Sequence, residues 1–306
     1  GELQFWVERL PLTETHEFPA GGTFPLFTND DGVLAVCTDG GVTNATATIM
    51  ALGMDPRFDL SNAYWLIAGI AGGDPADVSL GSAVWARYVI DGDLAFELDA
   101  REMPKDWPYG MIPLGNEEPA KPGADITKGW TVDTVNFTLN RTLAEWAFET
   151  TESVKLKAYK DTIEFSQQFS VFPNAVKPSF VTLGETLSAS TYWHGNKLNQ
   201  WANDWVQVYS TNEMNFMTSN MEDSGTLTAL ERLAKIDKID MDRIMVLRTV
   251  SNFTIPPPGK SAAWSATASY PDNGRPALET AFTVGNKVVQ TLLEGWETYE
   301  KEVPGS

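Results

Sequence analysis

Short apolar runs alternate with amphipathic segments along this chain, and this alternation constrains the fold more than any other feature. Six runs rich in Val, Ile and aromatic residues, bounded by Gly, Pro or Asp, predict β-strands; they span residues 33–38, 63–70, 82–90, 176–183, 214–219 and 243–250. Helical spacing of apolar residues predicts α-helices over residues 43–52, 137–159, 197–209, 223–234 and 277–299. Such alternation predicts an α/β fold, with a central mixed, largely parallel sheet flanked by helices and with ligands collecting at the carboxyl ends of strands.

Charge and hydropathy exclude two classes of partner. The formal net charge is −19, with 41 acidic against 22 basic residues, so phosphate backbones and anionic membrane surfaces are repelled. The longest uncharged apolar stretch lies between Asp59 and Asp74, contains glycines, and is shorter than the roughly 20 residues that a bilayer requires. We therefore expect no nucleic-acid partner and no membrane-spanning helix. The lone Cys37 leaves the cellular compartment open.

Six short segments carry polar residues or glycines, and four of them, at 38–45, 67–73, 220–223 and 248–252, lie at or near the ends of predicted strands. The six are residues 38–45 (TDGGVTNA), 67–73 (IAGIAGG), 97–102 (ELDARE), 192–195 (YWHG), 220–223 (NMED) and 248–252 (RTVSN). In this order they resemble the active-site segments of the nucleoside phosphorylase and nucleosidase superfamily, and the whole chain is similar to the purine nucleoside permease family within it. The resemblance implies a nucleoside phosphorylase-like three-layer fold, a purine nucleoside as ligand, and neither a metal nor a cofactor.

The N-terminus departs from that family. Its members begin with an additional strand and an acidic loop upstream of residues such as Trp6. We therefore expect a single domain over residues 1–306 without the first strand, and a site without any carboxylate that the strand supplies.

Glu222 is the residue that the resemblance assigns to the ribose. A carboxylate beside a strand end can accept hydrogen bonds from both ribose hydroxyls, and the resemblance places Met221 as an apolar floor under the sugar and His194 at its 5′-hydroxyl. The alternative for Glu222 is an acidic residue at a helix N-terminus, favoured there by the helix dipole. Of the two neighbouring acids, we predict that Asp223 caps the helix.

Asn252 occupies the position where many relatives carry an Asp that protonates the purine N7. An amide can form hydrogen bonds but cannot deliver a proton, which indicates weaker activation of the leaving base or recognition of a 6-oxopurine. The alternative is an Asn that stabilises a turn before the Pro-rich loop. Tyr192 and Trp193 match an aromatic position that stacks on the base, and their alternative role is packing in the core.

The glycine turn at Gly40 and Gly41 precedes a predicted helix, where backbone N–H groups could receive an anion or an attacking water. Asp39 beside the turn would repel phosphate. Phosphorylases carry an Arg and a Ser or Thr where this chain has Ala68 and Ile70. The phosphate site is therefore expected to be missing, which favours hydrolysis or plain binding over phosphorolysis.

Together these observations predict a purine nucleoside-binding protein that slowly hydrolyses the N-glycosidic bond without phosphate, with Glu222 and Asn252 as its catalytic residues. The first alternative is a non-catalytic component of nucleoside uptake that serves a separate membrane transporter, and the second is a purine nucleoside phosphorylase. We expect a periplasmic or secreted location, although no signal peptide is visible. The resemblance also admits a homo-oligomer.

Overall fold

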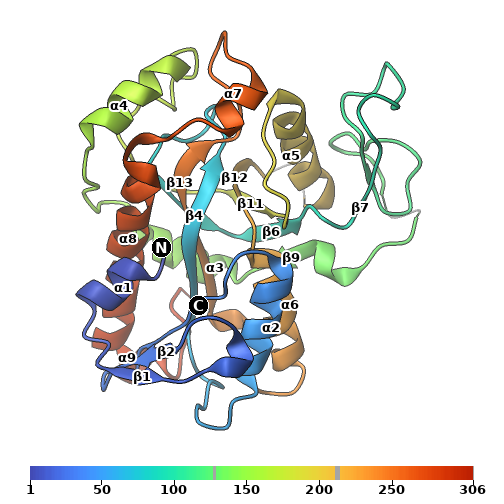
Figure 1. Ribbon diagram of the computed structural model, residues 1–306. Helices are drawn as coiled ribbons and strands as arrows, with labels where there is room; N and C mark the ends of the chain where they lie inside the picture. The colour runs from blue at the N-terminus through green and yellow to red at the C-terminus, as the bar shows by residue number, and fades with distance from the viewer. Residues whose placement is uncertain (127–128, 211–213, 306) are drawn as a thin grey trace.

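A mixed sheet forms the centre of the computed structural model, which describes residues 1–126, 129–210 and 214–305 (Figure 1). Its eight strands lie in the order β10 (Val181–Leu183), β5 (Ala83–Ala86), β13 (Ile244–Phe253), β4 (Trp65–Gly73), β12 (Phe216–Asn220), β11 (Glu185–Ser188), β6 (Tyr88–Asp91) and β9 (Asn136–Thr138). β4 runs parallel to β13 and antiparallel to β12. β11 is parallel to both of its neighbours.

Two small sheets lie beside this central one. β1 (Glu14–His16), β2 (Leu26–Thr28) and β3 (Leu34–Ala35) form an antiparallel sheet near the N-terminus. β7 (Ala95–Glu97) pairs with β8 (Met111–Pro113) in an arm that projects from the body of the molecule, at the right of Figure 1.

Helices cover both faces of the central sheet. The α-helices are α1 (Gln4–Arg9), α2 (Val42–Gly53), α3 (Arg141–Thr151), α4 (Lys160–Ser166), α5 (Asn196–Tyr209), α6 (Asp223–Ala234), α7 (Ala262–Ala266), α8 (Arg275–Glu294) and α9 (Trp296–Tyr299). Side chains of β13 alternate between two cores: Val246 packs with residues of α2 and α6, whereas Met245 and Leu247 pack with residues of α3 and α8. Because side chains along a strand alternate between its two faces, α2 and α6 lie on one face of the sheet and α3 and α8 on the other. This arrangement confirms the predicted α/β architecture.

Two predicted elements are wrong because each is divided in the structure, one by a tertiary contact and the other by a local helix cap. The predicted strand over 82–90 is split at Arg87 into β5 and β6, since the buried Glu185 accepts the N–H groups of Arg87 and Tyr88 at 3.2 and 2.8 Å. The predicted helix over 137–159 is the strand β9 followed by α3. There the Asn140 side chain accepts the N–H groups of Thr142 and Leu143, which fixes the start of the helix.

Other predicted elements differ in length. The run over 33–38 contains only the two-residue strand β3, and the run over 176–183 contains only β10. The helix predicted over 277–299 is divided at Gly295 into α8 and α9. β13 extends to Phe253, so Arg248 lies within a strand and not at its end. The helices predicted over 197–209 and 223–234 are confirmed as α5 and α6.

A cavity of about 780 Å³ lies beside the free part of β4. β4 pairs with β12 only through Gly72 and Gly73, and its earlier residues Trp65 and Ala68 line the cavity. Glu222 and Arg248 lie in the wall of the same cavity. No helix of the described ranges is both long and apolar enough to cross a membrane.

Candidate functional site

The strand pairing brings two groups of polar side chains to the same stretch of β4. Parallel pairing with β13 sets Arg248 opposite Gly69 and Asn252 opposite Gly72. β12 runs antiparallel to β4, with Ser219 opposite Gly72, so the chain after β12 returns along β4 and delivers Glu222 to Arg248. The two groups are three residues apart along β4, about 10 Å at the rise of a β-strand.

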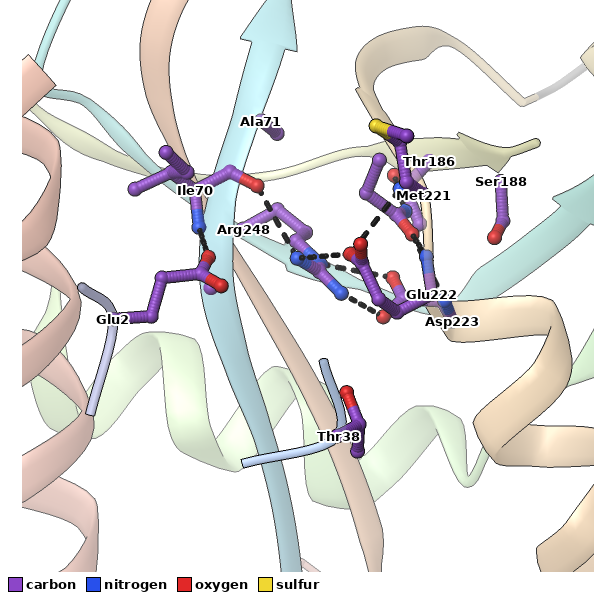
Figure 2. Close-up of polar contacts among 12 residues, drawn as sticks. Glu2, Thr38, Ile70, Ala71, Thr186, Ser188, Met221, Glu222, Asp223 and Arg248 are labelled. Carbon is purple, nitrogen blue, oxygen red and sulfur yellow. Dashed lines mark hydrogen bonds and ion pairs between the residues drawn. The ribbon is translucent and has the colours of Figure 1, made fainter. Parts of the chain in front are cut away.

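Arg248 is the centre of the first group. Its Nε donates to Asp223 Oδ2 at 3.1 Å and its Nη2 to Asp223 Oδ1, and both side chains are buried. Its Nη1 donates to the Ile70 carbonyl at 3.2 Å and lies 3.7 Å from Glu222 Oε2 (Figure 2). Burial alone would lower the pKa of Arg248, but the charge and hydrogen bonds of Asp223 outweigh burial and raise it. The guanidinium therefore stays charged.

Glu222 is held as a partly accessible carboxylate. Oε1 accepts the Gly41 N–H at 3.3 Å, Oε2 accepts the Met221 N–H at 3.3 Å, and the side chain is 19% exposed. Burial raises the pKa of Glu222, and the positive charge of Arg248 partly offsets this effect. Figure 2 shows Met221 next to this carboxylate. The accessible carboxylate can accept hydrogen bonds from a pair of hydroxyl groups.

The prediction that Asp223 caps α6 is wrong. Its carboxylate pairs with Arg248, while Asn220 Oδ1 accepts the Asp223 N–H at 2.9 Å and Ser188 Oγ accepts the Ser224 N–H at 2.9 Å. Glu222 occupies the N-cap position, but its side chain makes no capping hydrogen bond. The N–H groups in the first turn of α6 thus donate to the side chains of Asn220 and Ser188. The carboxylates of Glu222 and Asp223 are therefore both available to interact with Arg248.

Sequence reasoning missed Glu2, whose carboxylate lies near the same guanidinium, across Gly69. Glu2 Oε1 accepts the Ile70 N–H at 2.5 Å (Figure 2). A Cβ added at Gly69 would lie 2.6 Å from Glu2 Oε1 and would also meet the Arg248 guanidinium, so a glycine is needed where these two side chains meet. Glu2 lies just before α1 and in no strand, so its carboxylate is distinct from one that the family's first strand would supply. No local pattern marks it, because its position depends on the edge of β4.

The glycine turn contributes its amides to this group. Gly41 has a φ of 94°, which favours glycine, and its N–H donates to Glu222. The next N–H, that of Val42, donates to Ser190 Oγ at 3.1 Å. The Asp39 carboxylate accepts the Thr23 N–H at 3.3 Å. The amides of Gly41 and Val42 at the start of α2 are therefore bonded to side chains of the protein.

Asn252 and Tyr192 form the second group. Asn252 Nδ2 donates to the Tyr192 hydroxyl at 3.3 Å and to the Phe253 carbonyl at 3.2 Å, and Asn252 Oδ1 accepts the Ser251 hydroxyl at 2.9 Å. Asn252 Nδ2 lies 3.3 Å from a Cβ added at Gly72. Tyr192 is 50% exposed, and partial burial raises the pKa of its hydroxyl. This group is neutral and accessible.

Trp193 and His194 are the two remaining residues that the sequence predicts to contact the nucleoside. The Trp193 ring is 9% exposed and packs in the core, with centroids 5.6 Å from Trp201 and 6.0 Å from Phe216; core packing accounts for this residue. Neither ring nitrogen of His194 has a hydrogen-bond partner among the described residues, and burial lowers its pKa. His194 is therefore a neutral ring, and its contact with a ribose stays a prediction.

Within residues 1–126, 129–210 and 214–305, no three His, Cys, Asp or Glu side chains are grouped so that they could hold a metal ion. Asp223 and Glu222 are instead paired with the Arg248 guanidinium, and Glu2 accepts the Ile70 N–H.

Comparison with known sequences identifies relatives over almost the whole chain. The sequence pattern of the family described as purine nucleoside permease matches residues 1–304. A purine nucleoside permease of Candida albicans is 28% identical over 306 residues, covering 97% of this chain and 73% of the relative. A probable purine nucleoside permease of Schizosaccharomyces pombe is 29% identical over 226 residues, covering 72% of this chain and 64% of the relative.

Comparison with solved structures identifies the fold. A 5′-methylthioadenosine/S-adenosylhomocysteine nucleosidase from Neisseria meningitidis superposes with a TM-score of 0.56 at 14% identity, covering 95% of each chain. The futalosine hydrolase of Helicobacter pylori superposes with a TM-score of 0.53 at 13% identity, covering 94% of this chain and 93% of that one. The central sheet and its helices thus have the nucleoside phosphorylase-like architecture that the sequence predicts.

Proposed function

The chain belongs to the purine nucleoside permease family, and on that premise we propose that it binds purine nucleosides and hydrolyses their N-glycosidic bond to base and ribose. One observation carries the proposal: a carboxylate group around Arg248 and a neutral pair of Asn252 and Tyr192 lie beside Gly69 and Gly72, which are three residues apart along β4, about 10 Å at the rise of a strand. A purine nucleoside likewise has a sugar with vicinal hydroxyls at one end and a base with hydrogen-bond acceptors at the other. Family membership and the nucleosidase-like fold support this assignment.

In this proposal Glu222 binds the ribose. Its carboxylate is oriented by the Gly41 and Met221 amides and by Arg248, so little reorganisation is needed when it accepts two hydroxyl groups. Cleavage passes through a sugar with oxocarbenium character, and a fixed negative charge beside the sugar stabilises that positive charge.

Glu2 is our candidate for the base that activates water. One of its oxygens accepts the Ile70 amide and the side chain is exposed, so its carboxylate can also accept a proton. Water attacks C1′ while the bond from C1′ to the base nitrogen breaks. The base leaves with the bonding electron pair, and the proton taken from water returns to it through solvent. Because this carboxylate is present, only the inability of Asn252 to protonate the base still favours slow turnover.

The surroundings of the glycine turn support hydrolysis over phosphorolysis. The Gly41 and Val42 amides donate to Glu222 and Ser190, and the Ile70 amide donates to Glu2. Phosphate would have to displace one of these acceptors and enter a region with several carboxylates. Hydrolysis needs only water.

Incubation with inosine, adenosine and guanosine, with and without phosphate, tests the proposal. We expect free base and ribose at a rate that phosphate does not change. Ribose 1-phosphate as the product would instead identify a phosphorylase. A Glu2→Gln variant should lose turnover while it still binds nucleoside.

The second candidate is nucleoside binding without turnover, which the name of the permease relatives favours. In that case the chain is a periplasmic or secreted component that delivers nucleosides to a separate membrane transporter. Tight binding by calorimetry, with no free base released over days, would support this candidate and reject the hydrolase.

A further inference from the structure

We infer that the Tyr192 hydroxyl donates the hydrogen bond that recognises the purine base, at its N7, and that Asn252 positions this hydroxyl. The inference rests on the proposed function and assigns a specificity-determining residue to the same site. It changes the roles of both residues from those implied by the sequence, in which the Asn252 amide meets the base directly and Tyr192 only stacks on it.

The Asn252 amide already has a partner for each of its hydrogen-bonding groups. Its oxygen accepts the Ser251 hydroxyl at 2.9 Å, which shares its hydrogen with the Ala71 carbonyl at 3.2 Å, while its nitrogen donates to the Phe253 carbonyl at 3.2 Å and to the Tyr192 hydroxyl at 3.3 Å. An amide nitrogen carries two hydrogens, so these two bonds use both donors. The Ser251 and Phe253 contacts fix the orientation of the amide, and the amide in turn fixes the phenol.

The Tyr192 hydroxyl has an unused hydrogen. A phenol both donates and accepts, and here the oxygen accepts from Asn252. Among the described residues, the Tyr192 hydroxyl takes part in a hydrogen bond only as this acceptor. The ring is 50% exposed, so a ligand can reach this hydrogen. Partial burial raises the pKa of the hydroxyl, which keeps the hydrogen in place throughout the neutral range.

Of the acceptors on a purine, N7 is common to 6-oxo and 6-amino bases. Negative charge develops on the base as its bond to the sugar breaks, and a donor placed at N7 stabilises that charge. The hydrogen stays on Tyr192 throughout, so the contact needs no proton transfer. A site that uses this contact accepts inosine and adenosine alike, because it does not depend on the substituent at C6.

Calorimetry with inosine and 7-deazainosine, in which a C–H group replaces N7, tests this inference. We expect the wild-type protein to bind inosine about 3- to 10-fold more tightly than the deaza analogue, as for one hydrogen bond. Tyr192→Phe keeps the ring and removes the hydroxyl. The variant should therefore bind inosine only as tightly as 7-deazainosine, and its affinity for 7-deazainosine should equal that of the wild type. Tyr159→Phe is the matched control, since its hydroxyl bonds to Glu279 on α8, and it should keep the wild-type ratio.

The outcomes separate this inference from the proposed function. If Tyr192→Phe keeps the wild-type preference for inosine, or weakens both ligands equally, the hydroxyl does not meet N7 and the inference is wrong, while nucleoside binding stands. A wild-type protein that binds both ligands equally would also reject it. If the wild type binds neither nucleoside, the proposed function itself fails.

Discussion

The two ends of the candidate site are built from different chemistry. Around Gly69, the carboxylates of Glu222 and Asp223 approach one buried guanidinium and that of Glu2 lies nearby, and backbone amides hold Glu222 and Glu2 in place. Near Gly72, a neutral amide holds a half-exposed phenol. Hydrogen bonds to charged groups contribute about 1.5–3 kcal/mol, whereas neutral ones contribute about 0.5–1.5 kcal/mol. If the proposed function holds, the charged end would therefore bind the sugar strongly and in a fixed geometry, whereas the neutral end would bind the base more weakly and more permissively.

Replacing Arg248 should have the largest effect and would test whether the charged end depends on it. Arg248→Met leaves the buried Asp223 without its partner, which should lower the free energy of unfolding by about 3–5 kcal/mol. Urea denaturation measures this change. Arg141→Met is the matched control, because Arg141 pairs with Glu145 at the surface and should change stability by less than about 1 kcal/mol. Similar losses in both variants would remove the distinction between the buried and exposed pairs.

Glu222→Gln tests the same end through its ligand. The amide cannot accept charged hydrogen bonds from the ribose, so nucleoside binding should weaken by roughly 1.5–3 kcal/mol while binding of the free base is unchanged. Calorimetry with inosine and hypoxanthine gives both values. Glu231→Gln, further along the same helix, should leave both affinities unchanged. Equal losses for nucleoside and base would show that Glu222 does not distinguish the sugar.

A substitution in the glycine turn should have a smaller effect at the charged end of the site. Gly41→Ala places a side chain at a φ of 94°, so stability should fall by about 1–3 kcal/mol, and the N–H that orients Glu222 should shift. Gly40→Ala is a closely matched control, because a Cβ there meets no atom within 4 Å. Thermal unfolding compares the two variants. If Gly41→Ala is as stable as the wild type, the turn does not hold the Glu222 carboxylate in place.

The smallest effect is a pH dependence that only the charged end should show. The pKa of Glu222 lies above its ordinary value of 4.5 because of burial. Nucleoside affinity should therefore fall as the pH is lowered through this raised pKa, and Glu222→Gln should remove the dependence. The raised pKa of Glu222 has the opposite effect on the free energy of unfolding. The stability that Glu222 contributes is fully present below pH 4.5 and is lost as the pH rises through its pKa. Binding and unfolding measured between pH 4 and pH 7 would separate these trends.

The fold could be predicted from the sequence wherever periodicity was local. The apolar stripe of α5 and the bounds of α6 follow from the spacing of their residues. The split at Arg87 could not be predicted, because it depends on Glu185, a buried carboxylate from another strand. The strand β9 was predicted as helix because its pairing with β6 is non-local and leaves no mark on the apolar spacing of the run; Asn140 is a local signal for the later start of α3 that this prediction overlooked.

The site was predictable only in part, for a related reason. Glu222 and Asn252 could be singled out by resemblance, and the structure places them near two positions of one strand. The role of Arg248 depends on β12 running antiparallel to β4, which brings two acids from a different element to the guanidinium. Glu2 depends in the same way on the edge of β4. Trp193 lies in a sequence typical of a binding segment, but its packing depends on Trp201 and Phe216.

The surplus of carboxylates around Arg248 has a further consequence for selection among metabolites. One guanidinium cannot neutralise Glu2, Glu222 and Asp223 together, so the sugar end of the site has negative charge in excess. Nucleotides carry phosphate on the sugar, and like charges brought close together in a partly desolvated site repel strongly. The proposed site would therefore admit dephosphorylated nucleosides and reject the nucleotides that share their bases, without a steric barrier against the phosphate.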